Sequence, residues 1–138
     1  YAQHLGRRSL PHTPRHSILL LGAVGDHQVS EFALQVEART IGARGHVPYV
    51  APGREFGGEH GFGIVPLPSS SWPRSAYFLF DTGAELSPLD NRPPRVGHDP
   101  HDDTPKIPAA QALKDTFWRR RGYVTDVCEG GPCTGPQF

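Results

Sequence analysis

The sequence has no long apolar run and no net charge. No run of apolar residues approaches the ~18 that a membrane-spanning helix needs, so we expect no membrane span. Fourteen basic and fourteen acidic side chains cancel, which leaves no basic surplus of the kind that nucleic-acid-binding proteins carry. The composition therefore predicts a globular protein that does not bind nucleic acid.

Methionine is absent from all 138 residues, including the first position, which is Tyr1. No signal peptide can be recognised either. The length corresponds to about one domain. We interpret the chain as a fragment in which residues 1–138 form a single partial domain.

Cysteine is scarce, because only Cys128 and Cys133 are present, both in a tail of residues 123–138. The Gly and Pro residues between them permit the tight turn that a short disulfide loop needs. Two cysteines without neighbouring Cys or His ligands argue against a zinc site, and two free thiols are the alternative to a disulfide. A disulfide predicts an oxidising compartment, and hence a secreted or periplasmic protein.

Glycine and proline are abundant, with 16 and 15 copies, and predict long loops around a small framework. Residues 17–22 and 75–80 are continuous apolar segments, which are typical of strands buried on both faces of a parallel sheet. Residues 46–51 predict a third, short strand, which Pro48 restricts to an edge or a strand start.

Two further segments have the periodicity of amphipathic helices. The first opens at Ser30 as N-cap and ends at Gly42 and Gly45, and the second covers residues 108–121. The expected apolar face of the first helix is Val29, Ala33, Val36 and Thr40, with Ile41 beside them. Strands that alternate with helices predict an α/β fold, with a mostly parallel sheet flanked by helices.

Titratable side chains follow both apolar segments. Asp26 comes just after the first, and His98 and His101 lie in the loop after the second. Ligands of parallel sheets gather beyond the carboxyl ends of the strands, so we expect these residues at one rim. A histidine base that is oriented by a carboxylate is what activation of a serine nucleophile requires.

Two stretches resemble the α/β-hydrolase superfamily, in its lipase and esterase-like branch. Residues 19–29, with the run Leu-Leu-Leu-Gly-Ala-Val-Gly-Asp-His-Gln-Val, are similar to the strand that bears the triad acid. Residues 101–118 resemble the end of that family, where a histidine loop precedes a final amphipathic helix. The family order of Ser, then Asp or Glu, then His agrees with Asp26 before His101.

The resemblance implies that the chain is the C-terminal part of a hydrolase of small ester or acyl substrates that needs no cofactor. Asp26 would be the triad acid, with His101 the first choice for the base and His98 the second. The nucleophile motif Gly-x-Ser-x-Gly occurs nowhere in the sequence. A missing N-terminal half of the same domain would supply the serine, and the isolated chain would be inactive.

Several other interpretations remain open. Asp26 could simply cap the turn that follows it. The cluster His98, Asp99, His101, Asp102 and Asp103 offers ligands for a metal ion, which His27 or Asp26 could complete. The run Asp81-Thr82-Gly83 resembles the aspartic protease signature, whose chemistry needs two carboxylates. A binding module without enzymatic activity is also consistent with the missing serine.

Overall fold

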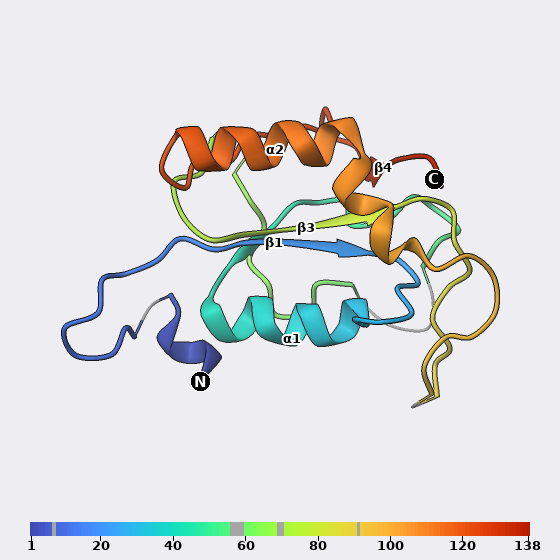
Figure 1. Ribbon diagram of the computed structural model, residues 1–138, viewed down its shortest axis with the longest axis horizontal. Helices are drawn as coiled ribbons and strands as arrows, with labels where there is room; N and C mark the ends of the chain where they lie inside the picture. Colours follow the sequence, from blue (N-terminus) through green and yellow to red (C-terminus); the bar gives the residue numbers. More distant parts are fainter. Residues whose placement is uncertain (7, 56–59, 69–70, 91) are drawn as a thin grey trace.

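The computed structural model describes residues 1–6, 8–55, 60–68, 71–90 and 92–138. Its strands are β1 (Leu19–Ala23), β2 (Arg44–Gly45), β3 (Ala76–Asp81) and β4 (Cys133–Thr134). Its helices are α1 (Glu31–Ile41), α2 (Pro108–Arg119) and the short turns η1 (Ala2–His4), η2 (Pro100–Asp102) and η3 (Thr104–Lys106). Figure 1 shows α1 on one face of the strands and α2 on the other, which confirms the predicted α/β class.

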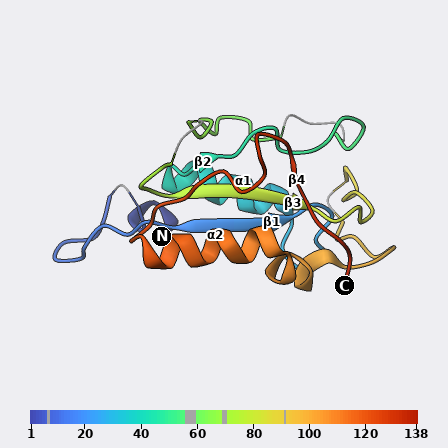
Figure 2. The same ribbon diagram turned by 90° about the horizontal axis from the view of Figure 1, so that it is seen from above.

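The strands run in the order β1, β3, β2, and every pairing is parallel. β1 and β3 pair along five residues, from Leu19 opposite Ala76 to Ala23 opposite Phe80. β4 pairs with the last residues of β3 from the C-terminal tail. β1 and β3 lie side by side in Figure 2, so the loops that follow them leave the sheet at the same rim.

β3 is the centre of the core, because all six of its residues are buried. Its side chains alternate between the two faces. Tyr77 and Leu79 belong to the apolar cluster on the α1 side, and Phe78 and Phe80 belong to the cluster that includes Leu113 of α2. Fully burying an aromatic or leucine side chain of this kind stabilises the fold by about 1.5–3 kcal/mol. The six-residue strand thus holds the two helices and the rim together.

The ends of α1 agree with the sequence prediction. The Ser30 hydroxyl accepts a hydrogen bond from the Phe32 amide at 3.2 Å, and Gly42 ends the helix in the left-handed conformation with φ of 72°. The glycine is required there because a side chain at this φ would be strained. Both helix-end signals are therefore confirmed.

The predicted apolar face of α1 is correct only at Ile41, which is buried, and wrong for the rest of the stripe. Val29 is 47% exposed and Val36 is 54% exposed, whereas the helix buries Glu31, Gln35, Ala38 and Ile41. Buried polar side chains are tolerated only when they are hydrogen-bonded, and both polar residues are. Gln35 accepts a hydrogen bond from the Gly61 amide at 2.9 Å. Long-range hydrogen bonds, which hydrophobic periodicity cannot reveal, thus set the orientation of this helix.

The other predicted elements hold in part. The strand expected at residues 46–51 is wrong, because the sheet pairing in this region is confined to Arg44–Gly45. The second predicted helix is present as α2 and ends at Arg119 rather than Arg121. A disulfide joins Cys128 and Cys133, whose Cα atoms are 5.1 Å apart. Among the helices of the described residues, none combines the length and the apolar character that crossing a bilayer requires.

Candidate active site

The turn after β1 fixes the carboxylate of Asp26. Gly25 has φ of 80°, and a Cβ there would lie 2.0 Å from the carbonyl oxygen of Glu85, so only glycine fits. Asp26 is 5% exposed, and its Oδ1 accepts hydrogen bonds from the amides of Gln28 at 2.7 Å and Val29 at 2.8 Å. Two backbone donors thus hold one carboxylate oxygen in place.

Asp99 fixes the position of His101. Asp99 precedes η2, and its Oδ1 accepts a hydrogen bond from the His101 amide at 3.1 Å. The same carboxylate accepts hydrogen bonds from the His27 amide at 3.2 Å and the Gln28 side chain at 3.0 Å. Desolvation opposes ionisation of Asp99, but these hydrogen bonds outweigh it and keep its pKa below the ordinary value. Asp99 therefore ties the histidine loop to the Asp26 turn.

Asp26 and His101 are hydrogen-bonded to each other. Nδ1 of His101 lies 2.9 Å from Oδ2 and 3.2 Å from Oδ1 of Asp26. This hydrogen bond raises the pKa of His101, because the carboxylate favours the charged imidazolium. A carboxylate can only accept, so in the neutral imidazole Nδ1 carries the proton and Nε2 keeps its lone pair. Among the described residues, no hydrogen-bond partner of Nε2 is found, and the His101 side chain is 36% exposed.

His98 is placed differently. Its Nε2 lies 2.6 Å from Oδ2 of Asp103, whose side chain is 1% exposed. Oδ1 of Asp103 also accepts a hydrogen bond from the amide of Phe138 at 3.1 Å. His98 thus bonds within its own loop, to Asp103, whereas His101 makes the hydrogen bond to Asp26. The catalytic role of Asp26 and His101 stays a prediction.

The five metal-ligand candidates of residues 98–103 do not converge. Asp103 bonds to His98, Asp99 accepts from backbone and amide donors, and His101 faces Asp26. Within the described part of the chain, a different set of donors lies close together: His46, Cys128 and Cys133. The geometry therefore gives the predicted metal cluster no support.

Asp81 of the Asp-Thr-Gly run forms an ion pair with Arg54. Nε of Arg54 lies 2.7 Å from Oδ2 and Nη2 lies 2.8 Å from Oδ1, while the Asp81 side chain is 5% exposed. The Gly83 amide donates to Oδ1 as well, at 2.8 Å. Asp81 lies at the end of a parallel strand in an α/β fold, whereas aspartic proteases have an all-β fold. The structure therefore favours a bidentate ion pair that fixes the loop after β3.

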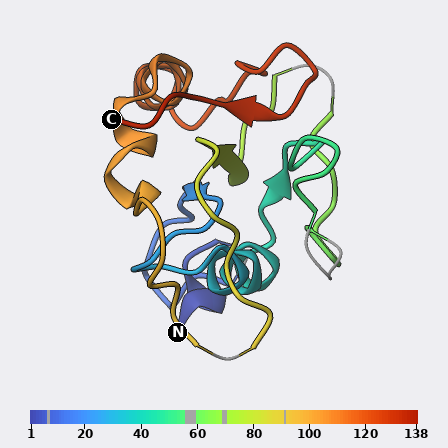
Figure 3. The ribbon, with the colours of Figure 1, turned by 90° about the vertical axis from the view of Figure 1, so that its right-hand side faces the viewer.

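A hollow of about 260 Å³ adjoins the Asp26–His101 pair. Its lining includes Leu21 of β1, Leu34 of α1 and Lys114 of α2, besides Asp26 and His101. The two helices cover opposite faces of the sheet, as the end-on view in Figure 3 shows. A hollow that touches both helices and β1 must lie along the outer edge of β1, the edge that faces away from β3.

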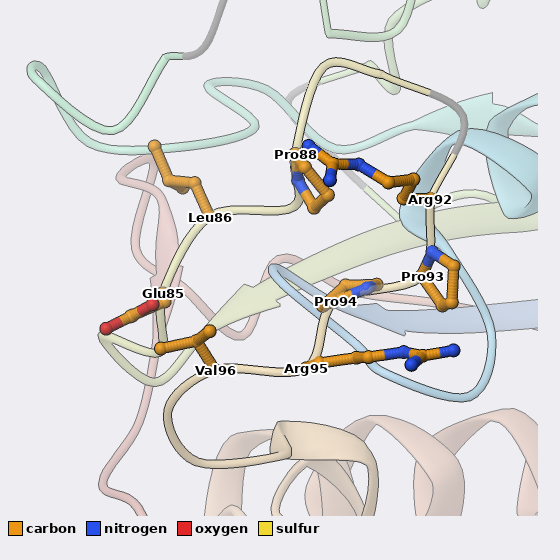
Figure 4. Close-up of a pocket in the computed structure, with 8 residues that line it drawn as sticks. All are labelled: Glu85, Leu86, Pro88, Arg92, Pro93, Pro94, Arg95 and Val96. Atoms are coloured by element: carbon orange, nitrogen blue, oxygen red, sulfur yellow. The ribbon is translucent and has the colours of Figure 1, made fainter.

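A larger hollow of about 490 Å³ lies in the loop after β3, between Glu85 and Val96 (Figure 4). Its wall combines three prolines and two apolar side chains with Arg92 and Arg95. Neither Asp26 nor His101 lines it. A third hollow, of about 540 Å³, is lined by Asp26 and His27 together with Ser87 of the loop after β3, so the acid of the pair faces the largest of these three hollows.

Sequence reasoning missed Glu31, a fully buried carboxyl group beneath the Asp26 turn. Its Oε2 accepts a hydrogen bond from the Ser87 hydroxyl at 3.0 Å, and its Oε1 faces the Gly25 amide at 3.4 Å. Burial raises the pKa of Glu31 above its ordinary value. No local signal could have found this residue, because its partner Ser87 is 56 positions away.

Comparisons with protein-family models, with curated proteins and with solved structures find no match to this chain.

Proposed function

We propose that this chain supplies the acid and the base of a serine-hydrolase triad that acts on small ester or related acyl substrates. The observation that supports it is the 2.9 Å hydrogen bond from Nδ1 of His101 to Asp26, with Nε2 left without a partner among the described residues. This arrangement is what a general base needs, because the carboxylate holds the imidazole in one tautomer and stabilises its charged form.

In the proposed reaction, Nε2 of His101 takes the proton of a serine hydroxyl as the oxygen attacks the acyl carbonyl. The imidazolium that forms is stabilised by the Asp26 carboxylate, which two backbone amides hold in place. His101 then returns the proton to the leaving alcohol. In the second half of the cycle, the same nitrogen activates a water molecule that hydrolyses the acyl-enzyme. No cofactor takes part in this cycle.

The nucleophile comes, in this proposal, from a preceding part of the same domain that pairs with the outer edge of β1. The first three residues of β1 are only half-buried although all are leucine. In the part of the chain that the structure describes, β1 pairs only with β3, and a free strand edge offers backbone donors and acceptors to a further strand; the 260 Å³ hollow lies along this edge. A parallel strand added there would end at the same rim as Asp26 and His101, where a serine could reach Nε2.

The disulfide between Cys128 and Cys133 supports a secreted or periplasmic location, because such bonds persist in oxidising compartments.

The experiment compares this chain with a longer protein that includes the coding sequence preceding it. Hydrolysis of p-nitrophenyl acetate and labelling by a fluorophosphonate are measured for both. We expect activity and labelling only in the longer protein. There, His101→Gln and Asp26→Asn lower kcat by several orders of magnitude, about 10⁴-fold where the wrong tautomer is imposed.

His98→Gln is the matched control, because His98 bonds to Asp103 and not to Asp26. It should change kcat little. Turnover that survives His101→Gln, or that falls equally in both histidine variants, contradicts the assignment of the base.

A further inference from the structure

A second group of chemically active side chains lies outside the candidate active site. Three potential ligand atoms lie within 4.8 Å of one another, one from each of His46, Cys128 and Cys133. The two cysteines form a disulfide, so their sulfur atoms are not free to bind an ion in this state. Cys133 is 1% exposed, and Cys128 is half-buried. Reduction would leave two thiols beside a buried imidazole.

His46 is already held as metal-binding histidines are. It is 6% exposed and its ring stacks on Phe78, with centroids 5.1 Å apart and planes 8° apart. Its Nε2 lies 2.8 Å from the carbonyl oxygen of Gly131. A carbonyl can only accept, so Nε2 carries the proton. Ligand histidines typically donate their second ring N–H to a backbone carbonyl in this way, which fixes the ring and the tautomer.

The other ring nitrogen faces a carboxylate. With the proton on Nε2, Nδ1 of the neutral ring has a lone pair, and it lies 3.8 Å from Oδ1 of Asp126. Asp126 also accepts hydrogen bonds from the amides of Cys128 at 2.8 Å and Gly130 at 2.7 Å, and it does not belong to the three donors that lie within 4.8 Å of one another. Zinc bonds of about 2.0–2.1 Å to nitrogen or oxygen and 2.3 Å to sulfur put tetrahedral ligands about 3.4–3.8 Å apart. A nitrogen and an oxygen ligand belong at the short end of this range, about 3.4 Å apart, so Asp126 would reach ligand distance only when the loop that it caps changes conformation.

An ion would also have a route to this position. A hollow of about 210 Å³ is lined by His46, Asp126 and Gly130, together with residues of the neighbouring loops. The backbone between the cysteines contains Gly130 and Gly131, which can change conformation at little steric cost. The two sulfur atoms can thus separate from bonding distance to ligand spacing through a change within residues 128–133, the loop that also carries the Gly131 carbonyl bonded to His46.

We propose that reduction of the disulfide creates a Cys₂-His-Asp site for zinc or a similar divalent cation, formed by Cys128, Cys133, His46 and Asp126. A dithiol reductant gives two electrons and two protons to the cystine and becomes a disulfide itself. Binding of the divalent ion then releases the two thiol protons, because the thiolates are the ligands. Cys133 lies in β4, which pairs with β3. The disulfide closes a loop within the tail, whereas an ion that also binds His46 would cross-link this loop to the segment after β2.

The test uses the purified chain, reduced with a phosphine that does not compete for the metal, and Co²⁺ as the probe. We expect one equivalent of Co²⁺ to bind, with thiolate charge-transfer bands and the visible bands of a tetrahedral site, and Zn²⁺ to displace it. The oxidised chain should show none of these bands. His46→Gln and Asp126→Asn should each weaken binding at least about tenfold, since each removes a ligand.

Exposed side chains outside the group provide matched controls: His16→Gln for the histidine and Glu129→Gln for the acid. Both should bind Co²⁺ as the wild type does. Asp126 lies near the surface, so we expect Asp126→Asn to fold, and the test stays decisive even if His46→Gln does not fold. The proposal is overturned if the reduced wild type shows no thiolate charge-transfer band, or if Asp126→Asn and the Glu129→Gln control bind equally well. The proposed metal site does not depend on the proposed hydrolase activity.

Discussion

Replacing Asp26 by asparagine and by alanine separates its two tasks. The carboxylate accepts hydrogen bonds from the Gln28 and Val29 amides through Oδ1 and faces Nδ1 of His101 through Oδ2. Asparagine keeps an oxygen for the backbone donors but presents an N–H group to the imidazole. Alanine removes both functions. A residue that only caps the turn should tolerate asparagine in every respect.

The expected magnitudes follow from these contacts. A hydrogen bond to a charged group contributes about 1.5–3 kcal/mol to the free energy of unfolding. Because the two hydrogen bonds from the backbone amides are partly exposed to water, we assign about 1 kcal/mol to each of them. Asp26→Ala should therefore lower the free energy of unfolding by about 2–3 kcal/mol, and Asp26→Asn by about 1 kcal/mol or less. With a urea m-value of about 2 kcal/mol/M, the alanine variant unfolds about 1 M earlier.

Urea unfolding measured by tryptophan fluorescence gives the stabilities, and ¹⁵N NMR of the histidine rings gives the tautomers and pKa values. In Asp26→Asn we expect His101 to carry its proton on Nε2 and its pKa to fall, because the carboxylate that raises it is gone. A raised histidine pKa stabilises the fold fully below about pH 6.5, and this contribution is lost as pH rises through the folded-state pKa. The stability gap between wild type and Asp26→Asn should thus be larger at acidic than at alkaline pH. An asparagine variant with an unchanged His101 tautomer and pKa would refute the pairing.

Three further changes test other parts of the structure. Arg54→Ala leaves the buried Asp81 carboxylate without its guanidinium and should lower the free energy of unfolding in urea by about 2–3 kcal/mol. This is less than the loss expected for a fully buried pair, because Arg54 is 26% exposed. Adding Asp81→Asn should restore part of the loss, and additive effects of the two changes would speak against the ion pair. Changing both Cys128 and Cys133 to serine opens a loop whose ends are 5 positions apart, and chain entropy predicts a loss of about 2 kcal/mol. Calorimetry should show a lower melting temperature, whereas an unchanged value would mean that the disulfide does not stabilise the fold. Burial raises the pKa of Glu31 from 4.5, so the wild type loses stability as pH rises from there through the folded-state pKa. Glu31→Gln should therefore gain in melting temperature relative to the wild type between about pH 4.5 and 7, and parallel pH profiles would contradict this.

The sequence predicts those parts of the fold that local signals determine. The two continuous apolar segments are the paired strands β1 and β3, and Ser30 and Gly42 bound α1 as their helix-end chemistry requires. The position of Asp26 just after β1 also follows from sequence. Its contact with His101 needs the additional fact that β1 and β3 are parallel neighbours, since only then do their following loops share a rim.

Long-range polar pairs could not be predicted. Arg54 meets Asp81 across 27 positions, and Glu31 meets Ser87 across 56. A side chain that pairs over such a separation has no periodicity or spacing to mark it. Sequence reasoning considered Asp81 for its Asp-Thr-Gly run, and the structure shows instead that an arginine from a distant loop occupies both carboxylate oxygens.

The error in the prediction of α1 leaves apolar side chains of this helix exposed. Val29 and Val36 form the apolar stripe that periodicity predicts, yet both are about half exposed, and Phe32 between them is 39% exposed. Val29 lines the hollow along the outer edge of β1. Among the described residues β1 pairs only with β3, so its outer edge is free for another strand. In the proposed complete sheet, a further strand at this edge would cover Val29 and bring the serine to the rim. The exposed Val29 and the free edge of β1 are therefore what this proposal leads us to expect.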